Sequence, residues 1–262
     1  MFDNEALDFI LPVGLPVVNA GPGAITNLVG TTQGDVSLGA FRVQSVNNGT
    51  NIAQGDSVLS DMRIANQSVF CSNGQGFPCA ALQANVQAQD YIADVTLSSG
   101  TSVQFQTVGG AVASDVGAWI CTDPISPGEL APGASPGDFS LSDIALLFPL
   151  NPAAVPAILN GTVVMQATCN RTCRLGKLFI TDAAFTGTAS VTSILVGGEE
   201  QLAQSTVVGI PLSAFHPLST MSNGDFDIDR VITPGEQVQI TITNGTAIGF
   251  QALGGIYCMS LD

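Results

Sequence analysis

The two halves of this sequence match each other, segment by segment and in the same order. Residues 38–43 (LGAFRV) resemble residues 175–180 (LGKLFI), and residues 117–121 (GAWIC) resemble residues 254–258 (GGIYC). Three further pairs of segments match at a similar offset: 6–12 with 145–150, 15–18 with 155–158, and 99–105 with 234–240. Chance could supply any one match, but collinear order at an offset of about 135 to 141 residues indicates a duplicated structural unit.

The segment between the two copies differs from both in composition. Residues 122–138 (TDPISPGELAPGASPGD) are rich in Pro, Gly and Ser, which cannot hold a helix or a central strand. We therefore predict a first sandwich over residues 1–121, a linker over 122–142 and a second sandwich over 143–262. The first unit includes an N-terminal arm, residues 1–12, that could reach neighbouring subunits.

Within each copy, apolar and polar residues alternate with the period of a β-strand. Val238, Ile240 and Ile242 point one way, while the Gln and Thr residues between them point the other. This strand begins after Pro-Gly and ends at Asn-Gly, which are turn dipeptides. The same alternation recurs over residues 103–107.

Residues 192–196 and 201–208 flank Gly-Gly-Glu-Glu and predict a hairpin. No stretch shows helical periodicity with caps at both ends. The pattern predicts an all-β fold with two tandem jelly-roll or β-sandwich units related by internal duplication, each long enough for eight strands.

Charged residues are scarce and mostly acidic. They form 10% of the 262 residues, against about 25% in typical soluble domains, and the formal net charge is -15. Lys177 is the only lysine, and the arginines are scattered apart from Arg171 and Arg174. We therefore expect no direct partner among nucleic acids, and no docking on anionic lipids through a polybasic patch. The N-terminal sequence predicts no secretory signal, and no apolar run predicts a transmembrane helix.

The six cysteines are too few for a disulfide framework in a chain of this length. The pairs Cys71/Cys79 and Cys169/Cys173 are close enough to bridge within a loop, but no secretory context favours oxidation. The Cys169/Cys173 spacing loosely resembles a zinc motif. No second Cys or His pair lies near it in sequence, so we interpret it as structural.

Residues able to carry catalysis are almost missing. His216 is the only histidine and precedes a proline, which predicts a surface loop residue. Residues 133–137 (GASPG) spell a hydrolase elbow, but Pro136 lacks the backbone N–H that an oxyanion needs. No phosphate-binding loop is present. We predict no catalytic residues and no enzymatic activity.

One acidic cluster is a candidate cation site. Alternation would project Asp225, Asp227 and Asp229 from one strand face, where their oxygens could hold Ca²⁺. Arg230 occupies the position where an EF-hand needs Gly. A solvated face neutralised by Arg230 is the simpler interpretation, and no other cofactor is expected. Five N-x-[ST] triplets, at Asn48, Asn66, Asn160, Asn170 and Asn244, are interpreted as turns rather than glycan sites.

Two β-rolls in tandem, with residues 231–244 (VITPGEQVQITITN) near the C-terminus, resemble phage virion proteins, and above all the double jelly-roll major capsid proteins. The resemblance implies a structural virion protein that self-assembles through homotrimeric capsomers into the icosahedral capsid of a bacteriophage. It implies neighbouring capsomers and other virion proteins as partners, and an internal lipid membrane in many relatives. The acidity fits an indirect contact with the genome.

Two other classes of function are weighed against a shell protein. A cell-surface or virion-peripheral binding module, such as a carbohydrate-binding sandwich, adhesin or receptor-binding spike, would need an exposed aromatic platform. Trp119 and Tyr257 lie in repeat-matched apolar strands where core packing is expected, which leaves Tyr91 and the phenylalanines. An enzyme would need a nucleophile and base that the sequence does not supply.

Overall fold

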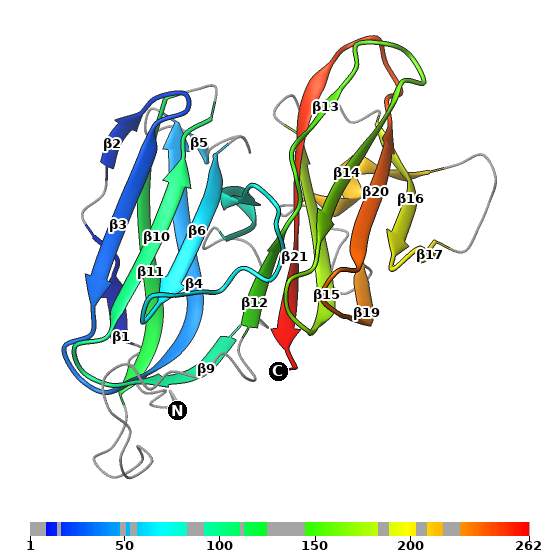
Figure 1. Ribbon diagram of the computed structural model, residues 1–262. Coiled ribbons are helices and arrows are strands. Elements are labelled where there is room, and N and C mark those ends of the chain that lie inside the picture. Colours follow the sequence, from blue (N-terminus) through cyan, green and yellow to red (C-terminus); the bar gives the residue numbers. More distant parts are fainter. Residues whose placement is uncertain are drawn as a thin grey trace, which may run out of the picture.

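The computed structural model describes residues 9–14, 17–47, 51–52, 57–82, 92–110, 113–124, 145–182, 189–202, 209–216 and 226–261. These ranges form two β-sandwiches that stand side by side, with their long strands running in the same general direction (Figure 1). Within the ranges, no helix has the length and apolar character to cross a membrane.

The first sandwich contains β1 (Phe9–Pro12), β2 (Val17–Ala20), β3 (Ile25–Thr31), β4 (Val36–Asn47), β5 (Asn51–Ile52), β6 (Val58–Ile64), β7 (Gln67–Ser68), β8 (Phe77–Pro78), η1 (Cys79–Leu82), β9 (Ile92–Leu97), β10 (Ser102–Val108) and β11 (Ser114–Pro124). The second contains β12 (Ala145–Pro149), β13 (Ala153–Val155), β14 (Thr162–Thr168), β15 (Cys173–Asp182), β16 (Ser190–Val196), β17 (Glu199–Glu200), β18 (Ile210–Pro211), η2 (Leu212–Phe215), β19 (Asp227–Ile232), β20 (Gln237–Thr243) and β21 (Phe250–Ser260). The elements η1 and η2 are short 3-10 helices.

Both sandwiches have the same strand order. In the first sandwich, one sheet has the strand order β1-β11-β4-β9, and the other has the order β3-β10-β6-β7. In the second, β12-β21-β15-β19 and β14-β20-β16-β17 repeat these orders strand for strand. The long strands β3, β4, β6, β9, β10 and β11, and their counterparts in the second sandwich, alternate between the two antiparallel sheets, which is the jelly-roll arrangement. The fold is therefore a double jelly roll, as the strand-period alternation and the internal repeat together predicted.

The predicted alternation is present where it was expected. Along β10 and β20, inward residues are buried and outward residues are partly exposed. Buried Val103 and Phe105 pack in the first sandwich, and Val238, Ile240 and Ile242 pack in the second. Small polar residues on the opposite faces of these strands remain partly in contact with solvent.

Three local predictions need correction. The hairpin after β16 turns at Gly197 and Gly198, both with positive φ, and its return strand begins at Glu199–Glu200, inside the predicted turn; Gln201 and Leu202 lie in no strand, and residues 203–208 lie outside the described residues. Two glycines suffice because both tolerate the left-handed backbone of a tight hairpin turn. Strand β11 continues to Pro124, three residues into the predicted linker, whereas residues 125–144 lie outside the described residues. Phe9–Pro12 pairs with β11, so this part of the expected arm belongs to the sheet.

Candidate functional site at the junction of the two sandwiches

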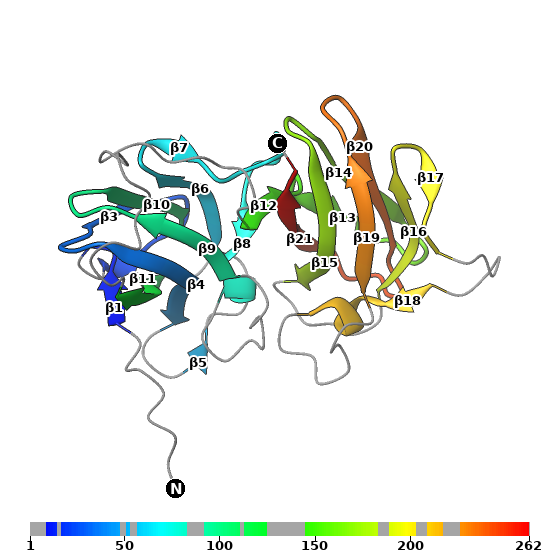
Figure 2. The same ribbon diagram turned by 90° about the horizontal axis from the view of Figure 1, so that it is seen from below.

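One segment of the first sandwich packs against the second. Residues 69–82, here called the junction segment, leave β7, pass through β8 and end with η1. Figure 1 shows this part of the chain, in cyan, between the two sandwiches, and Figure 2 shows β8 facing β12 and β21. Most of its side chains are buried, including all four residues of η1.

The junction segment extends a sheet of the second sandwich. The N–H of Leu147 donates to the carbonyl of Val69 at 3.0 Å, and the N–H of Cys71 donates to the carbonyl of Leu147 at 3.0 Å. These bonds form a parallel bridge between Phe70 and Leu147 on the outer edge of β12. The edge is thereby covered within the chain, which removes an open template for strand pairing.

A second set of bonds ties the same segment to the turn between β14 and β15. The N–H of Asn73 donates to the carbonyl of Thr168 at 3.0 Å, while the Asn73 side-chain oxygen accepts from the N–H of Thr168 at 2.8 Å. The Ser72 hydroxyl donates to the carbonyl of Pro149 at 2.6 Å. A Cβ on Gly74 would lie 1.9 Å from that same carbonyl oxygen, so the backbones approach as only glycine allows.

Aromatic packing completes the junction. The rings of Phe77 and Tyr257 lie 5.2 Å apart between centroids, and Phe179 meets Tyr257 edge-on at 5.0 Å. The buried Tyr257 hydroxyl donates to the carbonyl of Ala81 at 2.7 Å. A Cβ on Gly255 would lie 2.5 Å from the Phe77 ring. Because one continuous apolar cluster runs through both sandwiches, they form a single packed block.

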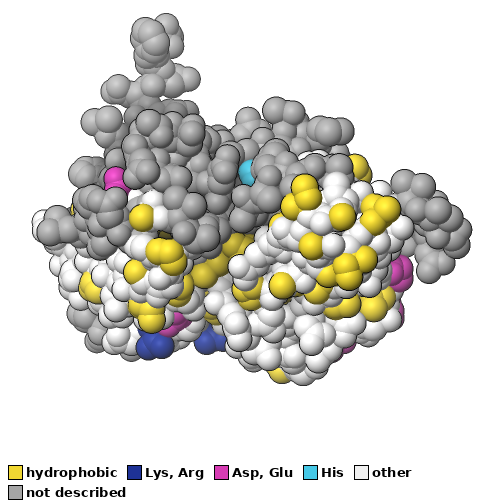
Figure 3. All heavy atoms as spheres, turned by 90° about the horizontal axis from the view of Figure 1, so that it is seen from above, with side chains coloured by type: hydrophobic (Ala, Val, Ile, Leu, Met, Phe, Trp, Pro, Cys, Tyr) yellow, Lys and Arg dark blue, Asp and Glu magenta, His cyan; other side chains and the backbone are white. Residues whose placement is uncertain are grey.

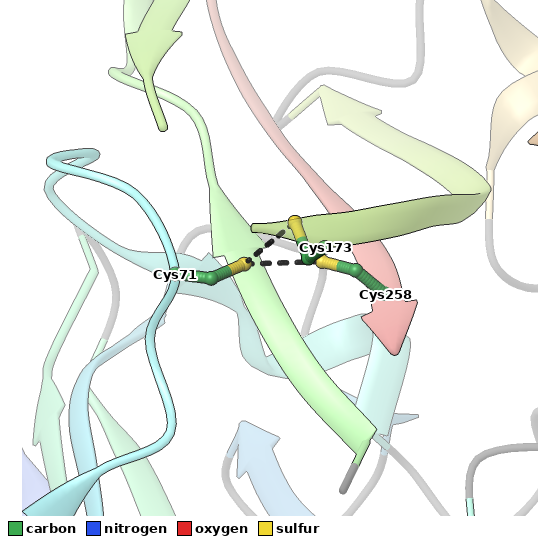
Figure 4. A group of neighbouring side chains, drawn as sticks. All are labelled: Cys71, Cys173 and Cys258. Atoms are coloured by element: carbon green, nitrogen blue, oxygen red, sulfur yellow. Dashed lines mark hydrogen bonds between the residues drawn. The ribbon is translucent and has the colours of Figure 1, made fainter. Parts of the chain in front are cut away.

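Four cysteines meet at this junction. Cys71 comes from the junction segment, Cys173 begins β15, and Cys258 lies near the end of β21 (Figure 4). The Cys71 sulfur lies 3.1 Å from that of Cys258 and 3.8 Å from that of Cys173. Cys169 sits beside them, with its sulfur 4.0 Å from that of Cys173. All four thiols are buried and none is in a disulfide.

Their contacts make these thiols unequal as acids. Burial disfavours the Cys71 thiolate, but hydrogen bonds with Cys173 and Cys258 outweigh that effect and lower its pKa to about 6. Burial and the neighbouring sulfurs raise the pKa of Cys258 well above its ordinary value. The hydrogen bond with Cys173, together with burial, also raises the pKa of Cys169. The Cys71 thiol is therefore easier to ionise than those of Cys169 and Cys258.

The sequence pattern did not single out this cluster. Cys71 and Cys258 are separated by 187 residues, so no local spacing connects them. In the sequence, Cys169 and Cys173 form a pair with no further Cys or His nearby, and the fold brings Cys71 and Cys258 to them through space. One signal was available: β12 and most of β21 are apolar without alternation, as expected for strands covered on both faces.

The predicted acidic cluster is only partly described. Asp225 lies outside the described residues, while Asp227 and Asp229 are exposed on β19. The Asp229 carboxylate accepts a hydrogen bond of 2.5 Å from Arg174, and Arg230 pairs with Glu199 instead of neutralising the aspartates. The Ca²⁺ site therefore stays a prediction that rests on the sequence.

Other residues singled out by the sequence lie as follows. His216 is only 7% exposed after η2, so the prediction of a surface histidine is wrong. It directly follows Phe215, the buried last residue of η2, so this end of the short helix faces the interior. Tyr257 is buried, as expected for a core residue, whereas Tyr91 and residues 133–137 lie outside the described residues, and so does the side chain of Trp119. Asn66 and Asn160 have positive φ, as turn residues do, and the Asn244 side chain is buried and hydrogen-bonded.

The strand order and the packed junction together define a double jelly-roll protein. No protein-family model matches the sequence, and a comparison with curated proteins found no match. Among solved structures, the chain is similar to the crystal structure of the major capsid protein P2 from Bacteriophage PM2. That match covers 97% of this chain and 97% of the other, at 10% sequence identity and a TM-score of 0.44.

Proposed function

We propose that this chain is a major capsid protein that forms homotrimeric capsomers and, through them, the icosahedral shell of a bacteriophage. The observation that carries the proposal is the junction: two jelly rolls of the same strand order are locked side by side into one block. A rigid pair of equivalent units is what a six-sided building block requires of each of three chains.

The contact between the rolls supports the trimer, because it joins unlike surfaces. The junction segment of the first sandwich covers the edge of β12 in the second. In the second sandwich β18 and η2 are the counterparts of β8 and η1, and in the first sandwich the counterpart of the β12 edge is on β1. Within the described residues, β1 pairs only with β11. A head-to-tail contact of this kind can repeat between chains and closes into a ring when the rotation permits.

The outer surfaces of both rolls carry exposed apolar side chains on the same edge strand of the repeated unit. Ile25 and Val29 on the edge strand β3 are 64% and 49% exposed, and Val164 on the matching strand β14 is 47% exposed. Figure 3 shows hydrophobic side chains spread over the described face of the second sandwich, among few charged ones. Such surfaces favour contacts with neighbouring capsomers and other virion proteins.

The charges support a shell that touches its genome indirectly. Three of the six basic side chains are engaged by carboxylates: Arg63 by Asp61, Arg174 by Asp229 and Arg230 by Glu199. Little positive charge is left to release counterions from nucleic acid. An internal lipid membrane between shell and genome is compatible with this balance.

Light scattering with size exclusion, followed by electron microscopy, tests the proposal. We expect trimers of the 26.8 kDa chain, about 80 kDa in mass, that convert to closed particles. Val29→Glu should reduce particle yield at least tenfold, whereas Gln33→Glu, with the same charge change at an exposed loop residue, should not. A monomer that forms no particle under any assembly condition would contradict the proposal.

A further inference from the structure

The cysteine cluster at the junction has the composition and spacing of a metal site. Three sulfurs, from Cys71, Cys173 and Cys258, all lie within 4.8 Å of one another. We propose that this group, with Cys169 as the fourth ligand, binds a thiophilic divalent metal ion of the Zn²⁺ class and fastens the two sandwiches together. The proposal does not depend on the capsid role.

The distances fit a tetrahedral thiolate site. With metal–sulfur bonds near 2.3 Å, the sulfurs of such a site lie about 3.8 Å apart. The separations here are 3.1 Å for Cys71 and Cys258, 3.8 Å for Cys71 and Cys173, and 4.0 Å for Cys169 and Cys173. The Cys169 sulfur lies outside the group of three and donates to the carbonyl of Arg171 at 2.7 Å, so its side chain would have to turn toward Cys71 and Cys258 to complete the site. Figure 4 shows the three central sulfurs converging from different segments.

The bare thiols gain little from this arrangement. Thiols are weak hydrogen-bond donors and weak acceptors, and the Cys71 and Cys258 sulfurs also contact the carbonyls of Leu147 and Ile256 at 3.4 and 3.6 Å. A metal ion would replace these weak contacts with coordinate bonds.

The ligand set identifies the kind of site. Soft sulfur ligands select Zn²⁺ over hard cations such as Mg²⁺ and Ca²⁺, and four protein ligands leave no open position for a substrate. The site would therefore be structural. Its ligands come from the junction segment, the turn before β15, and β21, so a bound ion would link both sandwiches at the point where they meet.

The test is to measure metal in the full-length chain, purified in reducing buffer without chelator. Elemental analysis should find about one zinc ion per chain. Cys71→Ser should lose the bound zinc. Cys79→Ser is the matched control, because Cys79 is an equally buried cysteine of the same segment outside the cluster, and this variant should keep the zinc.

A spectroscopic arm keeps the test valid if Cys71→Ser fails to fold. Wild-type protein stripped of metal and loaded with Co²⁺ should show the thiolate-to-cobalt charge-transfer absorption and intense visible bands of a tetrahedral site. A chain that binds neither zinc nor cobalt near one equivalent would overturn the proposal. So would peptide mapping that finds a Cys71–Cys258 disulfide in the freshly purified virion or protein.

Discussion

The segments after β7 and after β17 occupy the same place in two sandwiches of the same strand order, yet they pack differently. The first runs into β8 and η1 and inserts Phe77 against Tyr257 of the other sandwich. The second runs into β18 and η2 and packs Phe215 against Phe226 of its own sandwich, with ring centroids 4.2 Å apart. One copy of the repeated unit joins the rolls, and the other completes its own core.

The difference shows that the two copies of a duplicated unit can keep the same strand order and yet expose different surfaces. An insertion that covers a neighbour needs a complementary edge, and within one chain only one such contact can form. The segment after β17 is used within its own sandwich, so among the described strands the edge of β1 is the counterpart left for a contact between chains.

The largest expected effect is the loss of an aromatic ring from each segment. Phe77→Ala and Phe215→Ala should each lower the free energy of unfolding by about 3 to 5 kcal/mol, because both rings are fully buried. Only Phe77→Ala should uncouple the sandwiches. Denaturant unfolding with hydrogen exchange would then show two transitions for Phe77→Ala and one for Phe215→Ala. Uncoupling by Phe215→Ala instead would invalidate the comparison.

Adding a methyl group at Gly74, where the backbones of the two sandwiches come closest, should push the sandwiches apart without removing any core side chain. Gly74→Ala should cost about 1 to 3 kcal/mol, because its Cβ would meet the carbonyl of Pro149 at 1.9 Å. Gly34→Ala, which has no heavy atom within 4 Å, is the control and should stay within about 0.5 kcal/mol. Equal denaturation midpoints for the two variants would show that the junction is looser than described.

Removing one hydroxyl isolates the polar part of the junction. Tyr257→Phe should lower the free energy of unfolding by about 1 to 2 kcal/mol, because the buried carbonyl of Ala81 loses its donor while the ring contacts stay. The denaturant midpoint should fall with no change in slope. A stability equal to that of the wild type would mean that this bond adds nothing to the orientation of the sandwiches.

The smallest effect is expected on the outer edge of the second sandwich. Asp229→Asn should change stability by less than about 0.5 kcal/mol, because its partner Arg174 is 55% exposed and asparagine tolerates the same positive φ. Thermal unfolding with and without CaCl₂ would also test the candidate Ca²⁺ site. A calcium-dependent stabilisation lost in Asp229→Asn would establish that site on β19.

Residue-level equivalence between the copies was harder to predict than strand order. The sequence repeat equates Leu38 with Leu175 and Cys121 with Cys258. In the sheets, Leu38 lies opposite Thr122, while Leu175 lies opposite Cys258, so the two matches are one residue out of step. Each ladder has a register shift close by, and such bulges leave no clear mark in the sequence.

The sequence alone determined the local pattern: alternating strands such as β10 and β20, the turns that bound them, and a second copy of the same strand order. These follow from side-chain alternation and turn chemistry, which act over a few residues. Only the tertiary structure showed that the junction segment covers β12 and that His216 is buried. It also brought Cys71 into contact with Cys258, which is 187 residues away in the sequence. Such contacts depend on how finished sheets pack, and no local spacing encodes that packing.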